Sequence, residues 1–505
     1  MTTGVKQGLR CFFSIWSFLG ITLLSVGSIY YLSWNGFIDH GEVNMTSISW
    51  LIYHGHPLYT ALDAPERYSL EHGPLIYLLT GGLMQLLGAN YFTAKISGVL
   101  PLLGTIVLSW YWFSQVVNKK IAFWLIGLET WLLIKWYYLY LNRPDTLMIL
   151  CILVSIYVVT MKKNNVMTLI FVGISLGILL NLKVHGILYM IPILVLIQQN
   201  FGWKFLRSAL CIIGFVGILP FLHPSISLIH YVLWLGAAVS HGMSFKIVVG
   251  NLLVVLLFCL VPIYLSIYYQ QNFLKVYRDH RRFLTVTFVS LLLIALIGAK
   301  NGSGSHHLAP MLPIIMYINL ILIKEIVKFN TDSSVKGQGF AYRSRYILIF
   351  LIVFIITMGG VNGTGKLINH IKEQKMPIGM VEEFNTIQNK YSTQTMMMGY
   401  GENKTYKRYN QLIPQLVFAG NPYFIDGCAL MDMNYSGVGI PVGTIHELAE
   451  GSTQIWLIPV GDSPFSIPSW YNGTPIFDEK FRQTFFQNYV HIERGRYFDV
   501  WSYHK

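Results

Sequence analysis

The chain is poor in charged residues and in cysteine. Only 12% of its 505 residues are Asp, Glu, Lys or Arg and 54% are hydrophobic, whereas soluble domains carry about 25% charged residues. A chain this apolar cannot cover its surface in water, so we expect an integral membrane protein. The five cysteines form no Cys-X-X-Cys pair, which argues against redox chemistry, a disulfide framework and a zinc–thiolate site. No internal repeat is evident, which weighs mildly against a transporter built from two related halves.

The excess of basic residues gives the chain a formal net charge of +13. In a soluble protein this excess would point to nucleic acid. In a membrane protein it fits lysines and arginines retained on the cytoplasmic side of the bilayer. We therefore expect a lipid bilayer, and no nucleic acid, as partner.

Apolar runs near the length that crosses a bilayer, about 20 residues, recur along the chain. Eleven candidate spans lie at 11–33, 93–117, 121–140, 145–161, 166–182, 184–199, 206–223, 246–269, 283–299, 306–324 and 345–361. The first run is too long for a signal-peptide core and shows no cleavage site, so we interpret it as an anchor.

The run 73–88 decides the topology. It offers about 15 helix-compatible residues, which is short for a span. If it is an interfacial helix within a first outer loop, 34–92, the basic clusters fall on one side of the membrane. If it crosses the bilayer, that asymmetry is lost. We therefore predict about eleven transmembrane helices, a cytoplasmic N-terminus and an extracytoplasmic C-terminus.

The tail after residue 361 differs in composition from the rest of the chain. Residues 362–505 carry more than half of the 23 acids, and short apolar stretches alternate there with turn signals such as Asn472-Gly473. The sequence thus predicts a polytopic α-helical membrane domain, 1–361, followed by a small soluble α/β domain, 362–505. Its aromatic residues, Trp470 and Tyr471 among them, either form a core or line a glycan-binding surface.

Under this topology, acids, cations and histidines gather in the outer connections. They are Asp39 and Glu42 in the first loop, Arg143 and Asp145 in the second, Lys183 and His185 in the third, and Lys300, His306 and His307 after the ninth span. Charge near the apolar core of a bilayer costs free energy, so it is retained where it has a partner or a function. We predict that several of these side chains converge on an anionic ligand.

Acids and cations together at a membrane surface fit the transfer of a sugar from a lipid-phosphate carrier. The leaving phosphate develops negative charge, which the cations and histidines can stabilise. A carboxylate can accept or orient the proton of the acceptor. Alternatively, Asp39 and Asp145 hold a divalent cation, Mg²⁺ or Mn²⁺, on the phosphate.

Several motifs occur in an order that resembles a known family. They are Asp39-His40-Gly41-Glu42, Gly55-His56-Pro57-Leu58-Tyr59, Gly73-Pro74-Leu75-Ile76-Tyr77, Lys95, Asn142-Arg143-Pro144-Asp145 and His306-His307-Leu308-Ala309-Pro310-Met311-Leu312-Pro313. The arrangement resembles the polyprenyl-phosphate-dependent membrane glycosyltransferases of the GT-C fold class. These include protein mannosyltransferases (family 39-like), lipid A aminoarabinose transferases and oligosaccharyltransferases.

The resemblance implies a role for individual residues. It makes Asp39 the catalytic carboxylate with Glu42 in support, and it places Asp145 at the donor phosphate or metal. Which acid is catalytic stays open, because many relatives carry two adjacent acids and this chain does not. The implied phosphate-binding residues are Arg143, Lys183, Lys300, His306, His307 and Lys95.

The sequence therefore predicts an inverting glycosyltransferase. It would move a hexosyl or pentosyl group from a polyprenyl-phosphate donor to a lipid-linked, surface-glycan or protein acceptor on the extracytoplasmic face. The alternatives are a transporter of lipid-linked oligosaccharides and a surface-glycan polymerase or ligase. A transporter would need polar residues within its spans, and Glu129 is the clear mid-span acid, although a buried structural role suits it better than a proton relay. We regard the Asn-X-Ser/Thr triplets, such as that at Asn44, as chance, which favours a bacterial plasma membrane.

Overall fold

The computed structural model describes residues 3–69, 72–161, 166–332, 339–402 and 406–504. The chain forms two compact units. Unit 1 contains Met1–Ser33, Gly98–Leu219 and Met243–Leu367, and unit 2 contains Trp34–Ser97, Pro220–Gly242 and Ile368–Lys505. The predicted first outer loop is thus in the same unit as the tail. The domain boundary at residue 361 stays a prediction.

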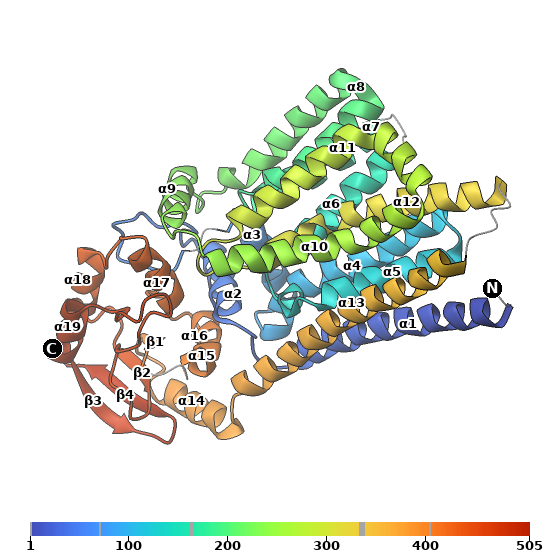
Figure 1. Ribbon diagram of the computed structural model, residues 1–505. Coiled ribbons are helices and arrows are strands. Elements are labelled where there is room, and N and C mark those ends of the chain that lie inside the picture. The colour runs from blue at the N-terminus through green and yellow to red at the C-terminus, as the bar shows by residue number, and fades with distance from the viewer. Residues whose placement is uncertain (1–2, 70–71, 162–165, 333–338, 403–405, 505) are drawn as a thin grey trace. The chain divides into compact units, whose positions relative to one another are not determined.

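Unit 1 is built from helices, most of them long and apolar (Figure 1). In chain order they are α1 (Thr3–Ser33), most of α4 (Tyr91–Val116), α5 (Lys119–Ile134), the 3₁₀ turn η1 (Tyr137–Tyr140), α6 (Pro144–Thr160), α7 (Val166–Leu182), α8 (Gly186–Ile218), α10 (Phe245–Tyr268), α11 (Gln270–Ile297), η3 (Ser305–Met311), α12 (Leu312–Asp332) and most of α13 (Gly339–Gln374).

Seven helices in the described ranges are long and apolar enough to cross a membrane. They span Gln7–Ser33, Tyr91–Val116, Gly186–Leu222, Phe245–Tyr268, Asn272–Ile297, Ser305–Lys328 and Ile347–Gln374. The predicted spans 145–161 and 166–182 correspond to shorter apolar helices, α6 and α7. The predicted class, a helical polytopic membrane protein, is confirmed.

Helix α8 combines the two predicted spans 184–199 and 206–223. Its backbone turns at Gly202, whose φ of 81° and ψ of −179° lie outside the helical region and suit glycine. A Cβ on Gly186, at the start of α8, would lie 2.7 Å from the carbonyl oxygen of Leu179. A Cβ on Gly177 would lie 2.6 Å from Val216, near the end of α8. Both ends of α8 therefore reach the C-terminal half of α7, and α8 is a hairpin.

Unit 2 combines the tail with the first loop and the connection after α8. Its helices are α2 (His40–Ile52), α3 (Pro74–Leu87), α9 (Leu228–Val239), α14 (Ile378–Lys390), α15 (Tyr406–Tyr409), α16 (Ile413–Phe418), α17 (Gly427–Tyr435), α18 (Val442–Glu450) and α19 (Glu479–Asn488), with a 3₁₀ turn η4 (Asn410–Leu412); a further turn, η2 (Leu219–Leu222), begins at the end of unit 1. Its strands are β1 (Met396–Met398), β2 (Ile455–Pro459), β3 (Tyr489–Arg494) and β4 (Phe498–Tyr503).

The run 73–88 forms α3, a helix of 14 residues. At a rise of 1.5 Å per residue it is about 21 Å long, less than the roughly 30 Å hydrocarbon core of a bilayer. It packs tightly on α2, because a Cβ on Gly81 would lie 2.3 Å from the carbonyl oxygen of Ser49. The length of α3 agrees with the interpretation that this run does not span the membrane.

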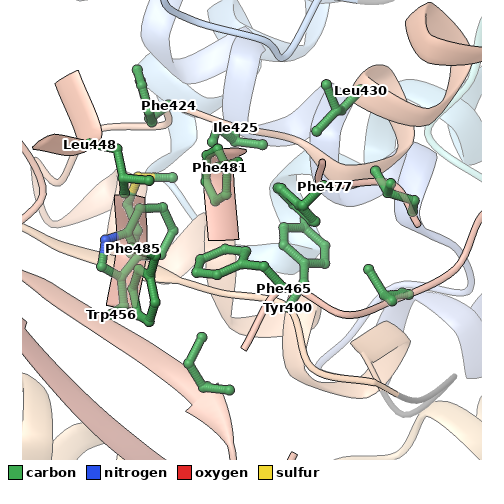
Figure 2. Packing of buried hydrophobic residues seen from close by; sticks show 14 of the residues in the cluster. Tyr400, Phe424, Ile425, Leu430, Leu448, Trp456, Phe465, Phe477, Phe481 and Phe485 are labelled. Atoms are coloured by element: carbon green, nitrogen blue, oxygen red, sulfur yellow. The ribbon is translucent and has the colours of Figure 1, made fainter. Parts of the chain in front are cut away.

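The four strands form one mixed sheet in the order β1-β2-β4-β3, in which only β1 and β2 are parallel. Every residue of β2 is buried, as expected of a central strand. Trp456 of β2 belongs to a cluster of buried aromatic and aliphatic side chains (Figure 2). The ring of Phe465 lies 4.9 Å from that of Phe477 and 5.0 Å from that of Phe481, in edge-to-face geometry. The predicted mixed α/β tail is confirmed, and its aromatic residues supply mostly core.

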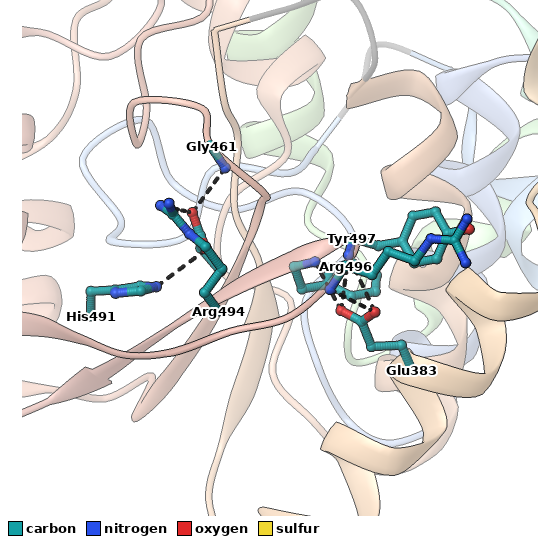
Figure 3. Close-up of polar contacts among 8 residues, drawn as sticks. Glu383, Gly461, His491, Arg494, Arg496 and Tyr497 are labelled. Atoms are coloured by element: carbon teal, nitrogen blue, oxygen red, sulfur yellow. Dashed lines mark hydrogen bonds and ion pairs between the residues drawn. The ribbon is translucent and has the colours of Figure 1, made fainter.

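Two carboxylates fix the β3–β4 hairpin (Figure 3). Glu383 of α14 accepts backbone N–H bonds from Arg496 at 3.1 Å and from Tyr497 at 3.0 Å. Asp499 accepts two bonds from Arg494, at 2.8 and 3.0 Å, and one from the backbone of Gly461 at 2.9 Å. The hairpin is therefore held by charge-assisted hydrogen bonds, which are stronger than neutral ones.

The first loop and the tail are joined by backbone pairing within unit 2. The N–H of Arg67 donates to Phe424 at 2.8 Å, and the N–H of Asp426 donates to Arg67 at 2.8 Å. The Arg67 side chain is fully buried and donates to the carbonyl of Leu62 at 2.5 Å. Burial lowers the pKa of Arg67 to about 10, so its guanidinium stays charged at neutral pH.

Candidate functional site

A buried ion pair lies at the centre of the predicted phosphate-binding residues of unit 1. Lys183 Nζ lies 2.8 Å from Asp145 Oδ1, and the two residues are 4% and 1% exposed. Asp145 is in the first turn of α6, directly after Pro144 at the first helical position, where a carboxylate interacts favourably with the helix dipole. Lys183 directly follows the end of α7. Two helix ends thus bring opposite charges together.

Two histidines from distant connections meet beside this pair. His307 Nδ1 lies 3.1 Å from His185 Nε2, within hydrogen-bond distance. Tyr189 holds this arrangement, since its hydroxyl donates to the carbonyl of His307 at 2.7 Å. His306 interacts electrostatically with Asp145. The connection after the ninth predicted span therefore reaches the α7–α8 connection, as the sequence predicted.

Arg143 completes the cluster from the second predicted loop. Its guanidinium carbon lies 5.2 Å from the centroid of Tyr138, and Tyr138 packs at 5.4 Å on His306. Trp136 Nε1 donates to Ser305 Oγ at 3.1 Å and ties the same two connections together. The aromatic residues before α6 thus hold Arg143 and His306 at one site.

The cluster has a buried part, which we call its floor, and a half-buried part, which we call its rim. Asp145 and Lys183 are buried, whereas the rim residues Arg143, His185, His306 and His307 are half-buried. The carboxylate of Asp145 interacts with Lys183, Arg143 and His306, and the imidazoles of His185 and His307 are paired beside them. The cluster is therefore suited to bind an anion of at least one negative charge.

The donor set around Asp145 does not fit a divalent cation. Asp145 Oδ2 is buried and has no hydrogen-bond partner in the described part of the chain, but Lys183 holds the other oxygen and Arg143 and His306 act on the same carboxylate. Like charges would oppose Mg²⁺ or Mn²⁺ there. Within the described ranges, no group of three or more His, Cys, Asp or Glu side chains could hold a metal. The shared metal site of Asp39 and Asp145, which belong to different units, stays a prediction.

The first-loop acids lie in unit 2, where they have different surroundings. Asp39 is half-buried and caps α2, since its side chain accepts from the N–H of Glu42 at 3.1 Å. Glu42 is fully buried and accepts from the N–H of Ile38 at 2.8 Å. Both carboxylates therefore accept backbone N–H groups at the start of α2. Asp39 is thus the more accessible of the two acids.

Lys95 lies in unit 2 with the first-loop acids. It is fully buried, interacts electrostatically with Glu42, and donates to the carbonyl oxygen of Trp34. Its ammonium group also lies 5.1 Å from the ring of Trp34. Lys95 therefore stabilises the segment that begins the first loop. Its predicted contact with the donor phosphate stays a prediction.

Lys300 is half-buried in unit 1, at the start of the connection that carries His306. Its backbone pairs with Met243 in an antiparallel bridge, and the N–H of Ser244 donates to Ala299 at 2.8 Å. The bridge places Lys300 at the beginning of α10. Its phosphate-binding role stays a prediction.

A pair of buried glutamines positions the backbone in front of Asp39. Gln411 Oε1 accepts from the N–H of Phe37 at 2.5 Å, and Gln374 Nε2 donates to the carbonyl of Ile38 at 2.6 Å. The two amides are joined by a bond of 2.9 Å. Neither residue can be found from the sequence, since an isolated glutamine in a tail carries no signal of its partner.

An exposed aromatic side chain lies next to the first-loop motif. Trp470 is 46% exposed, and its ring lies 5.2 Å from that of His40, the neighbour of Asp39. Tyr471, which follows it, donates its hydroxyl to Asp432 at 2.6 Å. Trp470 therefore differs from the buried aromatic core in exposing part of its side chain. His185, which the sequence placed with Lys183 in the third outer connection, was given no individual role there.

The fold and these sites define a class: multi-pass helical membrane proteins with a cation-rich cluster at their helix ends and a C-terminal α/β domain. No protein-family model and no curated protein matches the chain. Solved structures do match. ArnT from Cupriavidus metallidurans bound to undecaprenyl phosphate has a TM-score of 0.52 and 11% identity, over 99% of this chain and 98% of that chain.

The same ArnT in the apo state has a TM-score of 0.56 and 12% identity, over 96% of this chain and 97% of that chain. At such identities the likeness is one of fold alone. It extends over nearly the whole of each chain, tail included. The predicted GT-C-like architecture is confirmed.

Proposed function

We propose that this protein is an inverting glycosyltransferase that takes a sugar from a polyprenyl-phosphate donor. The observation that carries the proposal is the cluster of unit 1, where three connections bring Arg143, Lys183 and His306 to the carboxylate of Asp145, with the paired imidazoles of His185 and His307 beside them. The fold is that of ArnT, which was crystallised with undecaprenyl phosphate. Hexosyl and pentosyl donors both fit the proposal.

The cluster would bind the donor through its phosphate. Arg143 offers a planar fork of donors that matches phosphate geometry, and protonated imidazoles of His306 and His307 add charge-assisted bonds. Lys183, held by Asp145, supplies a fixed positive charge in the buried floor. Such preorganised cations stabilise the charge that develops on the leaving phosphate. Lys300 and Lys95 remain proposed contributors.

Asp39 is our proposed base, and Glu42 its support. Asp39 is half-buried and has one oxygen in the helix cap, whereas Glu42 is fully buried and bound to the backbone of Ile38. In the proposed step, an acceptor hydroxyl oxygen forms the new bond to the anomeric carbon and its proton goes to Asp39. The bond from the anomeric carbon to the phosphate oxygen breaks, and polyprenyl phosphate leaves with both electrons. Attack opposite the leaving group inverts the anomeric configuration.

The acceptor is proposed to be a lipid-linked glycan, a surface glycan or a protein, with Trp470 stacking on one of its sugar rings. An exposed aromatic ring offers a flat apolar face beside the first-loop motif. The proposal places this chemistry on the extracytoplasmic face of a bacterial plasma membrane. It is supported by the basic residues that gather in the opposite connections.

The test is Asp39→Asn. Asparagine also caps a helix, so this variant keeps α2 while it removes the base. We expect sugar transfer by purified protein to fall about 10²- to 10⁴-fold, with donor binding unchanged. Asp63→Asn, at an exposed acid of the same loop, is the matched control and should transfer at the wild-type rate. Wild-type transfer by Asp39→Asn would remove Asp39 from the mechanism.

A further inference from the structure

A cavity of about 460 Å³ lies in unit 1 between the α8 hairpin and α11. Its walls are apolar, with Ile191, Leu194 and Val195 from the first half of α8 and Val286 from α11. Polar residues lie at one part of the wall. They are Gln198, Arg281, Arg282 and Thr285. The volume is in the range of clefts that bind small molecules.

Two helix breaks shape this cavity. α8 turns at Gly202, and α11 is interrupted at His280, whose φ of −121° and ψ of 18° are not helical. Arg281 and Arg282 directly follow the second break, so they stand at the start of the long apolar half of α11. Trp203, which also lines the cavity, directly follows the first break and is 65% exposed. Both breaks are therefore at the same end of these helices.

The composition of this end is that of a membrane–water boundary. Trp is enriched at such boundaries, and clusters of Lys and Arg mark the side that faces anionic lipid. Arg281 and Arg282 are both exposed, and further exposed cations lie on the same segments, at Lys204 and Arg207 after the first break. Asp279 is the exposed acid of the α11 segment. The balance of charge at the cavity mouth is positive.

The cavity is distinct from the candidate functional site. His185 directly precedes α8, and Gln198 lies in the first half of that helix, thirteen positions further along the chain. At 1.5 Å per residue they are separated by roughly 20 Å along the helix. The cavity lining begins at Ile191, about 9 Å along the helix from His185, and its polar part at Gln198 lies at the other end of the first half of the α8 hairpin.

We propose that this cavity is a binding site for an anionic phospholipid of the leaflet that faces the basic connections. The phosphate would be held by Arg281 and Arg282, with Thr285 and Gln198 as further hydrogen-bonding groups. One acyl chain would lie along Ile191, Leu194 and Val195. Paired guanidinium groups above an apolar groove are complementary to a lipid that carries a phosphate at the head of a hydrocarbon chain. The site would fix the α8 hairpin to α11.

Binding can be measured by native mass spectrometry of the full-length, delipidated protein in detergent. The probes are phosphatidylglycerol, phosphatidylcholine and undecaprenyl phosphate. We expect phosphatidylglycerol to bind to the wild-type protein in preference to phosphatidylcholine. Arg281→Gln/Arg282→Gln should weaken phosphatidylglycerol binding roughly thirtyfold, since each cation near an anionic lipid contributes about fivefold.

Three further variants make the result specific. Arg278→Gln removes an exposed charge of the same helix that does not line the cavity, and it should leave phosphatidylglycerol binding unchanged. Val286→Trp fills the cavity while all cations remain, and it should abolish binding. Arg281→Lys/Arg282→Lys keeps both positive charges and should retain most of the phosphatidylglycerol binding. Thermal unfolding of each variant checks that the protein is folded.

Three outcomes would overturn the proposal. One is wild-type phosphatidylglycerol affinity in the double Gln variant or in Val286→Trp. Another is an equal loss in Arg278→Gln, which would show attraction to diffuse surface charge. The third is tighter binding of undecaprenyl phosphate than of phosphatidylglycerol with the same arginine dependence, which would make the occupant a carrier lipid.

Discussion

Variants of the buried ion pair Lys183–Asp145 can distinguish a role in stability from a role in sugar transfer. The two residues are 4% and 1% exposed, and their charged atoms are 2.8 Å apart. Replacing Lys183 by Met leaves the carboxylate of Asp145 buried without its closest cation. Breaking one partner of a buried ion pair costs about 3–5 kcal/mol. We therefore expect Lys183→Met to unfold at a markedly lower temperature and to transfer no sugar.

The double variant Lys183→Met/Asp145→Asn removes both charges. Replacing a buried ion pair by neutral groups of similar volume is often neutral in stability. We expect the double variant to recover most of the stability that the single variant loses, but none of the activity, because the floor of the phosphate site has lost its cation. Thermal unfolding in detergent and sugar transfer from a polyprenyl-phosphate donor measure the two properties on the same preparations.

If the double variant transfers sugar at the wild-type rate, Lys183 does not act on the donor phosphate. The ion pair is then a structural feature of the α7–α8 connection. Equal losses of stability in the single and double variants would instead refute the prediction that the unpaired carboxylate of Asp145 is what destabilises Lys183→Met.

Three further outcomes are expected. Trp470→Ala should raise the KM for the acceptor up to about tenfold and leave kcat unchanged, since aromatic contacts contribute about 0.5–1.5 kcal/mol; an unchanged KM would exclude the stacking role. Partial burial alone would raise the pKa of Asp499, but the hydrogen bonds and charge of Arg494 hold that pKa below its ordinary value. Its contribution to stability is therefore present above about pH 4 and lost as the pH falls further, so hydrogen exchange in β4 should rise more steeply with acid in the wild type than in Asp499→Asn. Glu129, buried in α5, accepts from Ser109 at 3.0 Å; Glu129→Gln should keep sugar transfer, and its loss together with wild-type activity of Asp39→Asn would favour a transporter.

The order of the polar motifs predicted part of the cluster but not its pairing. The sequence placed Arg143, Lys183 and His307 in outer connections, because alternate spans return to the same side of a membrane. It could not assign Asp145 to Lys183 rather than to a metal. That choice depends on where the helix ends meet, which is set by packing between α6 and α7.

In the first loop, too, the sequence predicted which residues matter but not which contacts they make. The position of Asp39 after the first span predicted a catalytic role, which stays a prediction. Its place as the cap of α2 and the deeper burial of Glu42 follow from local backbone geometry. The glutamines that hold Phe37 and Ile38 come from a tail more than 300 residues away. No periodicity in the sequence connects such positions.

Hydrophobicity and run length act locally along the chain, and for this reason the sequence by itself determined that the protein is a polytopic helical membrane protein with a mixed α/β tail. Contacts between distant segments depend on how the helices pack. Lys183 and Asp145 are 38 positions apart and His307 and His185 are 122 apart. Only the tertiary structure could decide that they meet, because a buried charge is stabilised by whichever partner the packing places within a few ångströms of it.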